Sequence, residues 1–416
     1  MKCVFCSMMY QDPESDVRNA NKPKPISGHK FQESLIEGLI ENDVDLTVYN
    51  LSLLSVYPFS KKKVVRKGGV LVAGRRVGEH IGYINFPYIN YILQYFKLKH
   101  RLIDIVGKNN PEDIILMVYN SYYIQSKTVL SVKKRYPRVT TCNVVGDLYG
   151  KHGLRNPGKG FRAAWGRFIE RRQEECQSRF DKYILLAPLM RDALELSERD
   201  YVVVEGFYYP EHAELTETVN HNGRKDELET DDRSMRILFY AGSLNAMYGI
   251  EHLLAAFKLI KDDKYSLYIA GRGPSEALIK KYAEKDSRIH FLGFLTPKEV
   301  KEYQSKATVL ISPRQTKAEF VKYSFPSKTF ECLASGKPYI AHKLPSEPEE
   351  YKDYIQYPED ESDEALARKI TEICSLPKAR RDAIGKRGRE FILTYKNPSM
   401  MCKKVADFFK SFNPAD

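Results

Sequence analysis

The sequence predicts an α/β protein in which two doubly wound, Rossmann-like domains face each other across a cleft. The chain has 416 residues, which suits two domains better than one core. Apolar, strand-like runs alternate with amphipathic helical segments in both halves, and such alternation predicts parallel sheets covered by helices. A polar, charged stretch at 211–235 separates the halves and is interpreted as a linker.

Residues 1–210 form the predicted first domain. A helix follows the opening strand, and its Leu35 and Leu39 belong to one apolar stripe. A second segment with helical spacing, 87–106, is rich in Tyr, Ile and Leu, and GVLVAG and IGYINF are candidates for two additional strands. The main predicted strands are KCVFCSMMY, VDLTVYN, DIILMVY, VTTCNVVG, KYILLA and YVVVEG.

Residues 236–395 form the predicted second domain, where the same alternation restarts. Residues 396–416 contain a last helix that is expected to pack back on the first domain. The predicted strands of the second domain are RILFYAG, YSLYIAG, IHFLGF, TVLISP and PYIA, and its predicted helices span 250–260, 275–284, 297–305, a segment from Pro326, 364–374 and 378–394.

The net charge of +12 is concentrated in the first half, which has 32 Lys and Arg against 22 Asp and Glu. Residues 61–76 alone carry seven basic side chains and no acidic one. A basic patch attracts phosphate, whether in nucleic acid, an anionic bilayer or a phosphorylated acceptor. A solvated basic face is the alternative. A nucleic-acid binder is disfavoured, because the basic clusters are not part of a recognisable zinc-finger or RNP module.

Cysteine usage and hydropathy predict a cytoplasmic protein. The seven cysteines are scattered and do not form a disulfide framework. Cys3 and Cys6 form a C-x-x-C in a predicted buried strand, where core packing is favoured over metal binding or redox chemistry. The start of the chain lacks the pattern of a signal peptide, and no apolar run reaches the length of a membrane span. The Asp43–Asp45 pair is interpreted as a chance match to a metal motif, so no metal is predicted.

The segment 312–338 is the predicted centre of the chemistry. It leaves an apolar strand, crosses a polar loop and enters a helix near Pro326, with Ser324 as the expected N-cap. A loop that enters a helix in this way favours an anion, and Arg314, Lys322 and Lys328 place cations around it. The motifs GSLNAMYG, GRGP and LGF also follow strands of the second domain, so they should meet at the same sheet edge. A phosphate site at that edge is therefore favoured over a solvated face.

The motifs together resemble those of the GT-B fold and, more closely, the retaining glycosyltransferases of family 4, especially the branch found among bacterial surface-polysaccharide enzymes. The resemblance covers nearly all of residues 230–395 and, more loosely, residues 1–210. Each motif is weak alone, but the combination is specific. The motifs that carry it are YAGSLNAMYGIEHLLAAF, LYIAGRGP, IHFLGFL, VLISPR, YSFPSKTFECLASGKPYI, SGHKFQESLIEGL, VVGDLYG and LLAPLM.

The resemblance implies a nucleotide-diphosphate-sugar donor, expected to be UDP-linked, on the second domain and a glycan or polyprenyl-diphosphate-linked acceptor on the first. It implies transfer of a hexose-type sugar with retention, by attack of the acceptor hydroxyl on the face that the phosphate leaves, without a protein nucleophile, a metal or another cofactor. The implied catalytic residues are Glu331, Lys328, Asp147 and His29, with Gly28 beside His29 in the loop that reaches the cleft. The implied donor-binding residues are Gly242, Ser243, Arg272, Phe291, Gly293, Phe294, Arg314, Lys322, Ser324, Ser327, Lys328 and Glu331.

The chain departs from the family pattern at two places. Tyr323 occupies the position of the first glutamate of the Glu-x7-Glu motif, of which Glu331 is the second, and Glu319 is the nearest substitute. Ser243 and Tyr248 stand where an arginine and a lysine usually follow the first glycine turn. Arg314, Lys322 and Lys328 are candidates to replace their charge.

Two other functions and one location are also compatible with the sequence. The chain could be an epimerase-type enzyme that acts on the nucleotide-sugar itself, or a non-catalytic scaffold that keeps the fold. The basic residues 61–76 and the aromatic 87–106 helix suggest peripheral attachment to the inner face of the plasma membrane. The alternative for 87–106 is a buried core helix with a basic end.

Overall fold

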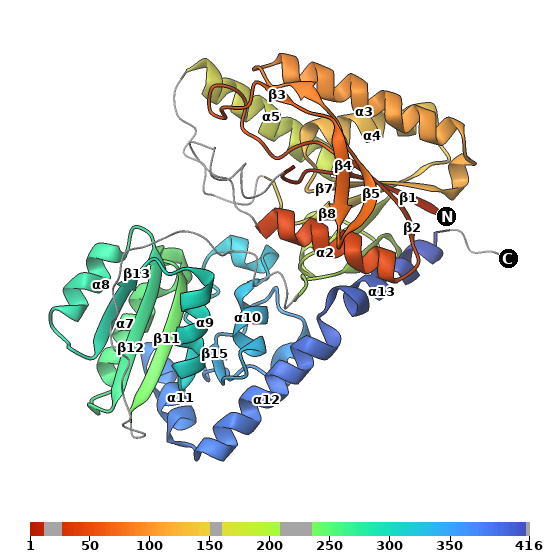
Figure 1. The fold of residues 1–416 in the computed structure, drawn as a ribbon. Helices are drawn as coiled ribbons and strands as arrows, with labels where there is room; N and C mark the ends of the chain where they lie inside the picture. Colours follow the sequence, from red (N-terminus) through yellow and green to blue (C-terminus); the bar gives the residue numbers. More distant parts are fainter. Residues whose placement is uncertain (12–26, 150–159, 209–234, 413–416) are drawn as a thin grey trace. The chain divides into compact units, whose positions relative to one another are not determined.

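The computed structural model describes residues 1–11, 27–149, 160–208 and 235–412 (Figure 1). The chain divides into two compact units. The first comprises Met1–Phe207, Tyr323–Phe325 and the C-terminal residues from Pro398, and the second comprises Tyr208–Lys322 and Pro326–Asn397. The predicted linker lies outside the described residues except for its last residue, Met235.

The first unit contains an eight-stranded sheet in the order β10-β9-β8-β7-β1-β2-β5-β4. Every neighbouring pair is parallel except β4 and β5. A separate two-stranded antiparallel ribbon joins β3 and β6. The strands are β1 (Lys2–Ser7), β2 (Asp45–Asn50), β3 (Val64–Val65), β4 (Gly68–Val72), β5 (Arg75–His80), β6 (Tyr83–Ile84), β7 (Ile114–Tyr119), β8 (Thr140–Val145), β9 (Lys182–Leu185) and β10 (Tyr201–Val203).

The antiparallel edge was not predicted. Ala73 and Gly74 both have positive φ, 49° and 73°, and form the two-residue turn between β4 and β5. Two consecutive positive φ values are characteristic of a tight hairpin, which reverses the chain at once and leaves no room for a crossover helix. The segment GVLVAG is therefore the first arm of a hairpin, and IGYINF contributes only the short β6.

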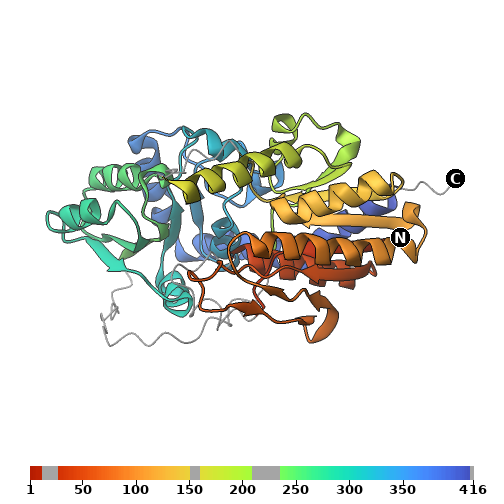
Figure 2. The ribbon, with the colours of Figure 1, turned by 90° about the horizontal axis from the view of Figure 1, so that it is seen from above.

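Helices cover both faces of this sheet (Figures 1 and 2). Alternate residues of β1 join two different apolar clusters, with Val4 in one and Phe5 in the other, so the strand is buried on both faces. Cys3 and Cys6 are fully buried members of these clusters. The helices are α2 (Ser27–Glu41), α3 (Ile89–Gly107), α4 (Tyr123–Arg135), α5 (Phe161–Gln177), α6 (Met190–Ala193) and α13 (Pro398–Lys410).

The C-terminal helix α13 lies beside α2 in the first unit (Figure 1). Gly38 makes this close approach possible, because a Cβ at that position would collide with the Pro398 carbonyl and lie 2.6 Å from the Cys402 Sγ atom. Met401, Cys402 and Phe409 of α13 are buried in the same apolar cluster as Leu35 and Leu39. The last helix thus completes one face of the first sheet.

The second unit contains a five-stranded parallel sheet in the order β13-β12-β11-β14-β15. The strand order reverses between β11 and β14, as in a doubly wound fold, and ligands of such folds bind at the carboxyl ends of the strands at this reversal. The strands are β11 (Arg236–Ser243), β12 (Tyr265–Arg272), β13 (Ile289–Gly293), β14 (Val309–Ser312) and β15 (Tyr339–Ala341).

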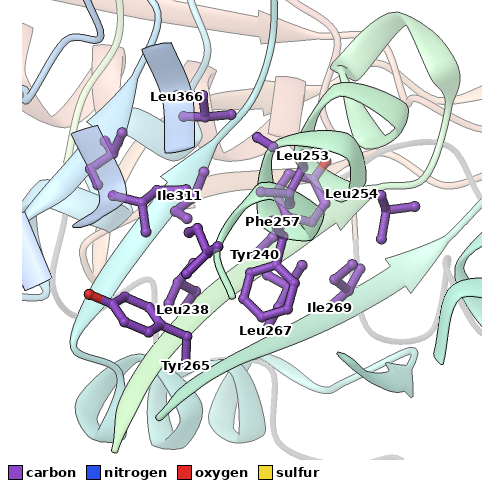
Figure 3. Close-up of a cluster of buried hydrophobic side chains, with 14 of the residues drawn as sticks. Leu238, Tyr240, Leu253, Leu254, Phe257, Tyr265, Leu267, Ile269, Ile311 and Leu366 are labelled. Carbon is purple, nitrogen blue, oxygen red and sulfur yellow. The ribbon is translucent and has the colours of Figure 1, made fainter. Parts of the chain in front are cut away.

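An apolar core joins this sheet to the helices on one face (Figure 3). Leu238 and Ile269 from neighbouring strands pack with Leu253 and Phe257 of α7 and Leu366 of α11. The core holds the strands in register, so the loops at their carboxyl ends start from fixed points. The helices are α7 (Ile250–Leu259), α8 (Glu276–Ala283), α9 (Pro297–Lys306), α10 (Lys328–Ala334), α11 (Asp363–Ser375) and α12 (Lys378–Tyr395).

Candidate functional site

The first part of the site lies at the end of β11 in the second unit. The Lys328 ammonium, at the start of α10, donates a hydrogen bond to the Ala241 carbonyl and lies 6.0 Å from the centroid of the Tyr240 ring. The Tyr240 hydroxyl donates to the Ser243 carbonyl at 2.9 Å. Partial removal from water lowers the pKa of Lys328, although part of its side chain stays exposed. The structure therefore brings three predicted residues, Gly242, Ser243 and Lys328, to one strand end.

Glycines bring the neighbouring loops close to this strand end. A Cβ on Gly242 would lie 2.5 Å from the Tyr240 hydroxyl and 2.9 Å from the Lys328 ammonium. Gly271, opposite Gly242 in β12, leaves space for the Gly242 carbonyl. Gly249 has a φ of 80° and faces the Pro313 carbonyl, so both its backbone conformation and its surroundings require glycine. The ends of β11, β12 and β14 are consequently packed backbone against backbone.

Arg314 follows β14 and lies on the other side of the strand-order reversal. Its side chain is buried, with 5 % exposed, and neither its Nε nor its Nη2 atom has a hydrogen-bond partner among the described residues. The guanidinium lies between two aromatic rings, 4.7 Å from the Phe320 centroid and 5.7 Å from the Tyr248 centroid. Burial lowers the pKa of Arg314. A buried cation with unsatisfied N–H groups is costly for a protein that binds no anion there.

The loop that carries Arg314 is attached to the start of α11. The Gln315 side chain donates to the Glu361 carbonyl at 2.9 Å, and the Thr316 amide donates to the Glu361 carboxylate at 2.7 Å. Asp363, the first residue of α11, contacts His252, which bridges it to His342: His252 Nδ1 lies 2.5 Å from Asp363 Oδ1, and His252 Nε2 lies 2.8 Å from His342 Nε2. Burial, followed by the His252 charge, lowers the pKa of His342 to about 4.

The helix predicted from Pro326 begins two residues later. Lys328 is the first residue of α10, Ser327 is its N-cap without a side-chain hydrogen bond, and Ser324 precedes both. Pro326 forms the preceding turn, because its carbonyl accepts from the Thr329 amide at 2.9 Å. Glu331 lies one turn further on the exposed side of α10. Since α10 has only seven residues, the cations contribute more to an anion site here than the helix itself.

A rim follows β12 and β13. The Arg272 guanidinium lies 4.4 Å from the centroid of the exposed Phe294 ring. Gly293, with a φ of 69°, turns the chain immediately before Phe294. Phe291 packs instead against the apolar core of the unit, and the Lys280 ammonium lies 5.8 Å from its ring. Arg272 and Phe294 thus form a pair, whereas Phe291 is part of the wall.

The segment between Arg314 and α10 contains the short 3-10 helix η5 (Glu319–Tyr323). Glu319 and Lys322 lie on it, and Lys322 is exposed. Tyr323 and Phe325 belong to the first unit, where Tyr323 packs against the apolar cluster that includes Ile124 and Met190. Tyr323 is therefore a packing residue, which fits its poor match to a motif glutamate.

The first unit has a second candidate site, at the reversal of strand order between β1 and β7. Tyr119 is the last residue of β7, and its hydroxyl lies between two glycines. A Cβ on Gly28 would lie 3.4 Å from this hydroxyl, and a Cβ on Gly146 would lie 3.1 Å from it. Gln32 ties the first turn of α2 to β1, because its side-chain amide donates to the carbonyls of Met8 and Gly28 at 3.0 and 2.8 Å. Gly28 and Asp147, which follows Gly146, are thereby brought to one sheet edge.

Asn120 holds Asp147 in place. Its side-chain amide donates to the Asp147 carboxylate at 3.2 Å, and the Asp147 amide donates back to the Asn120 side chain at 2.9 Å. Asn120 and Ser121 both have positive φ, 54° and 48°, an uncommon backbone conformation that clusters at functional sites. Burial, followed by the Asp147 charge, raises the pKa of Tyr122 to about 12.

The His29 side chain packs along α2, the helix to which it belongs, instead of pointing away from it. The ring is buried, its Nε2 atom lies 3.2 Å from the Glu33 carboxylate, and it makes an edge contact with Tyr10. Burial raises the pKa of Glu33 to about 7. His29 and Glu33 therefore form a titratable pair at the same sheet edge as Gly28.

Sequence reasoning missed Tyr240, Tyr119, Asn120 and Glu33. Asn120 left a signal, because the apolar run IILMVY breaks into Asn-Ser at its carboxyl end, and asparagine tolerates a left-handed backbone. Tyr240 and Tyr119 lie inside strands and read as core residues, so nothing in the pattern distinguishes their hydroxyls. Glu33 has the appearance of an ordinary polar helix position.

A protein-family model matches most of the second unit. Residues 224–391, less than half of the chain, match the family model for glycosyl transferases group 1. This match confirms the prediction of a glycosyltransferase. No curated protein sequence matches the chain.

Solved structures confirm the GT-B fold class. Sucrose-phosphate synthase from Thermosynechococcus elongatus has a TM-score of 0.60 at 15% identity, with 100% of both chains covered. Anabaena Alr3699/HepE in complex with UDP has a TM-score of 0.61 at 11% identity, with 99% of this chain and 100% of that one covered. The lipopolysaccharide outer core galactosyltransferase WaaB has a TM-score of 0.58 at 12% identity, with 99% of both chains covered.

Proposed function

We propose that the chain is a retaining glycosyltransferase that transfers a sugar from a nucleotide-diphosphate-sugar, UDP-linked, to a glycan or lipid-linked acceptor in bacterial surface-polysaccharide synthesis. The observation that carries the donor class is Arg314. It is a buried guanidinium with two unpartnered nitrogen atoms, at the carboxyl end of β14 next to the reversal of strand order. Diphosphate oxygens are the acceptors that such a group lacks.

Arg314 and Lys328 act on the same leaving group from two sides. Both side chains contact or influence Tyr240: the Lys328 ammonium lies over its ring, and Arg314 is among the charges that act on its hydroxyl. As the bond between sugar and diphosphate breaks, negative charge grows on the phosphate, and cations already in place stabilise it. A well-placed donor of this kind contributes about 3–4 kcal/mol to a transition state.

An anion can reach the unpartnered Arg314 nitrogen atoms only if a covering group moves, because these atoms have almost no exposed surface. The unpartnered nitrogen atoms are covered, and the Phe320 ring from η5 stacks on the guanidinium. We propose that donor binding displaces Phe320, so that phosphate oxygens replace the aromatic contact. Glu331 on α10 then holds the ribose, with Ser327 at the phosphates and the Arg272–Phe294 rim at the base.

The first unit is proposed to hold the acceptor at the edge formed by Gly28, His29, Asn120 and Asp147. The hydrogen bonds between Asn120 and Asp147 fix one carboxylate at that edge. Retention requires the acceptor hydroxyl to attack on the face that the diphosphate leaves, with its proton passing to the leaving phosphate. No protein nucleophile and no metal take part in this scheme.

The test is a thermal-shift screen of UDP, GDP, ADP and CMP and their sugars, followed by product analysis. The proposal expects stabilisation by UDP and UDP-sugars, and sugar transfer with retained anomeric configuration. Turnover of donor without acceptor into an epimeric sugar would instead indicate the epimerase-type activity. Absence of nucleotide binding in the full chain would contradict the proposal and leave a scaffold.

A further inference from the structure

One face of the first unit combines exposed apolar side chains with an excess of cations. It consists of the outer side of α3, the β3–β6 ribbon and the residues around them, and is called the α3 face below (Figure 1). Between residues 57 and 103 the chain has ten Lys and Arg residues and one acidic residue, Glu79. The exposed apolar side chains of this face are Phe59, Val64, Ile84, Phe86, Ile89, Ile92 and Phe96.

Helix α3 carries apolar side chains on two sides, one facing the core and one facing outward. Leu98 and Leu102 point into the core and are fully buried. Ile89, Ile92 and Phe96, spaced three and four residues apart, lie on the opposite side with 52 %, 57 % and 64 % exposed. Single exposed apolar residues need no explanation, but a contiguous row of large ones marks an interaction surface.

A surface pocket of about 630 Å³ lies between α3 and the ribbon. Val64, Ile84 and Phe96 form its apolar part. Its charged lining has four Lys and Arg side chains against the single carboxylate of Glu79. That carboxylate is already neutralised, because it pairs with Arg101 and, at 3.1 Å, with Lys67. The cations and His100 in the lining are Arg66, Lys67, Lys97, His100 and Arg101.

We propose that the α3 face docks on the surface of a membrane containing anionic phospholipid, with a lipid headgroup phosphate in this pocket. Charge complementarity selects the occupant: the surface is cationic and apolar at once, which matches the boundary between anionic headgroups and acyl chains. A bulky aromatic and aliphatic row would enter the headgroup layer while the lysines and arginines stay at the phosphates. The helices of the described segments are each too short or too polar to be a membrane span.

This inference goes beyond the proposed function, because it does not depend on the donor or on sugar transfer. It would place a lipid-linked acceptor within reach of the first unit. The aromatic cluster of Trp165, Tyr88 and Phe168 adjoins α3, with Trp165 centred 5.0 Å from Tyr88 and 5.4 Å from Phe168. Trp165 is the only tryptophan in the chain, so its fluorescence reports on this region.

The experiment is flotation of the full chain with vesicles of phosphatidylcholine alone or mixed with phosphatidylglycerol. Binding is expected only to the mixed vesicles, and it should be lost at about 1 M salt, where charges are screened beyond about 3 Å. The double variant Lys61→Gln/Arg66→Gln should bind roughly 25-fold more weakly, at about fivefold per cation. Ile92→Ser/Phe96→Ser should also lose binding. Lys386→Gln/Leu393→Ser on α12, which changes one cation and one exposed leucine elsewhere, should bind like the original chain.

Three outcomes would overturn the proposal. The first is no binding to the mixed vesicles at low salt, and the second is binding that both α3-face variants retain. The third is a dimer that dissociates on Phe96→Ser in the absence of vesicle binding, because the face would then serve a second copy of the chain. Unfolding curves and UDP-induced thermal shifts of the same variants separate this test from the proposed function, since the α3-face variants should keep both unchanged.

Discussion

The Arg314 guanidinium lies 4.7 Å from the centroid of the Phe320 ring, with no hydrogen-bond acceptor for its Nε and Nη2 atoms among the described residues. The contact compensates only in part for the loss of water around a buried cation. We propose that a bound ligand supplies the missing acceptors. In this proposal, the η5 turn that carries Phe320 covers an anion site.

Arg314→Met is therefore expected to stabilise the ligand-free protein. Removing a buried charge and its unsatisfied N–H groups should raise the free energy of unfolding by about 1–3 kcal/mol. Urea unfolding measures this. The matched control is Arg381→Met, because the Arg381 guanidinium donates to the Cys374 carbonyl at 3.1 Å and to the Leu376 carbonyl, and its loss should destabilise. Destabilisation by Arg314→Met would indicate an ordinary structural arginine.

Gly242→Ala should disturb the donor side of the site. The added methyl group would lie 2.5 Å from the Tyr240 hydroxyl and 2.9 Å from the Lys328 ammonium, so at least one must move. Overpacking of this kind costs about 1–3 kcal/mol, and displacement of Lys328 should weaken nucleotide binding. Calorimetric titration with UDP measures the affinity. Gly166→Ala on α5 is the control, since its Cβ would meet nothing within 4 Å, and it should stabilise by up to about 1 kcal/mol without changing affinity.

Asn120→Ala and Asn120→Gly separate backbone conformation from side-chain chemistry. Both remove the hydrogen bonds to Asp147, but only glycine tolerates a φ of 54° without strain. Asn120→Ala should unfold about 1 kcal/mol more easily than Asn120→Gly. Both should reduce use of the acceptor in a transfer assay while UDP affinity stays unchanged. A loss of UDP affinity in both would place Asn120 outside an acceptor site.

Stability of the second unit should fall on acidification because of His342. Its pKa is lowered from 6.5 to about 4, so the folded state holds the ring neutral while the unfolded chain takes up a proton below pH 6.5. The stabilisation is complete above the unfolded pKa and is lost as the pH falls through the window from about 6.5 to about 4. It amounts to something on the order of 3 kcal/mol. His342→Gln should flatten the pH dependence of urea unfolding over this window, and an unchanged slope would contradict the assignment.

The sequence predicted the main features of the fold because strand-like runs and helical stripes are local signals. It also predicted that the loops after β11, β12, β13 and β14 meet, since the carboxyl ends of parallel strands share one edge. The hairpin at Ala73–Gly74 was missed because a short two-residue turn resembles any strand boundary. The start of α10 at Lys328, rather than Pro326, depends on the turn that Pro326 closes with Thr329.

The least predictable features of the site depend on distant partners. The Tyr240 hydroxyl turns back to the Ser243 carbonyl under the Lys328 ammonium, and Arg314 receives its aromatic neighbours from Tyr248 and Phe320. The sequence places Lys328 far from Tyr240, and Tyr248 far from Arg314. The charge and polarity of these residues could be read from the sequence. The burial of Arg314 without acceptors for its Nε and Nη2 atoms could not, because it depends on how the chain packs.

Calorimetric titration of UDP into the original chain, Arg314→Met and Arg381→Met tests the central claim most directly. The account predicts that Arg314→Met weakens binding by at least about 30-fold, corresponding to the loss of about 2 kcal/mol or more from a buried charged hydrogen bond. It predicts that Arg381→Met binds UDP as the original chain does, under conditions in which all three are folded. Equal affinity of the original chain and Arg314→Met would contradict the assignment of Arg314 to the diphosphate.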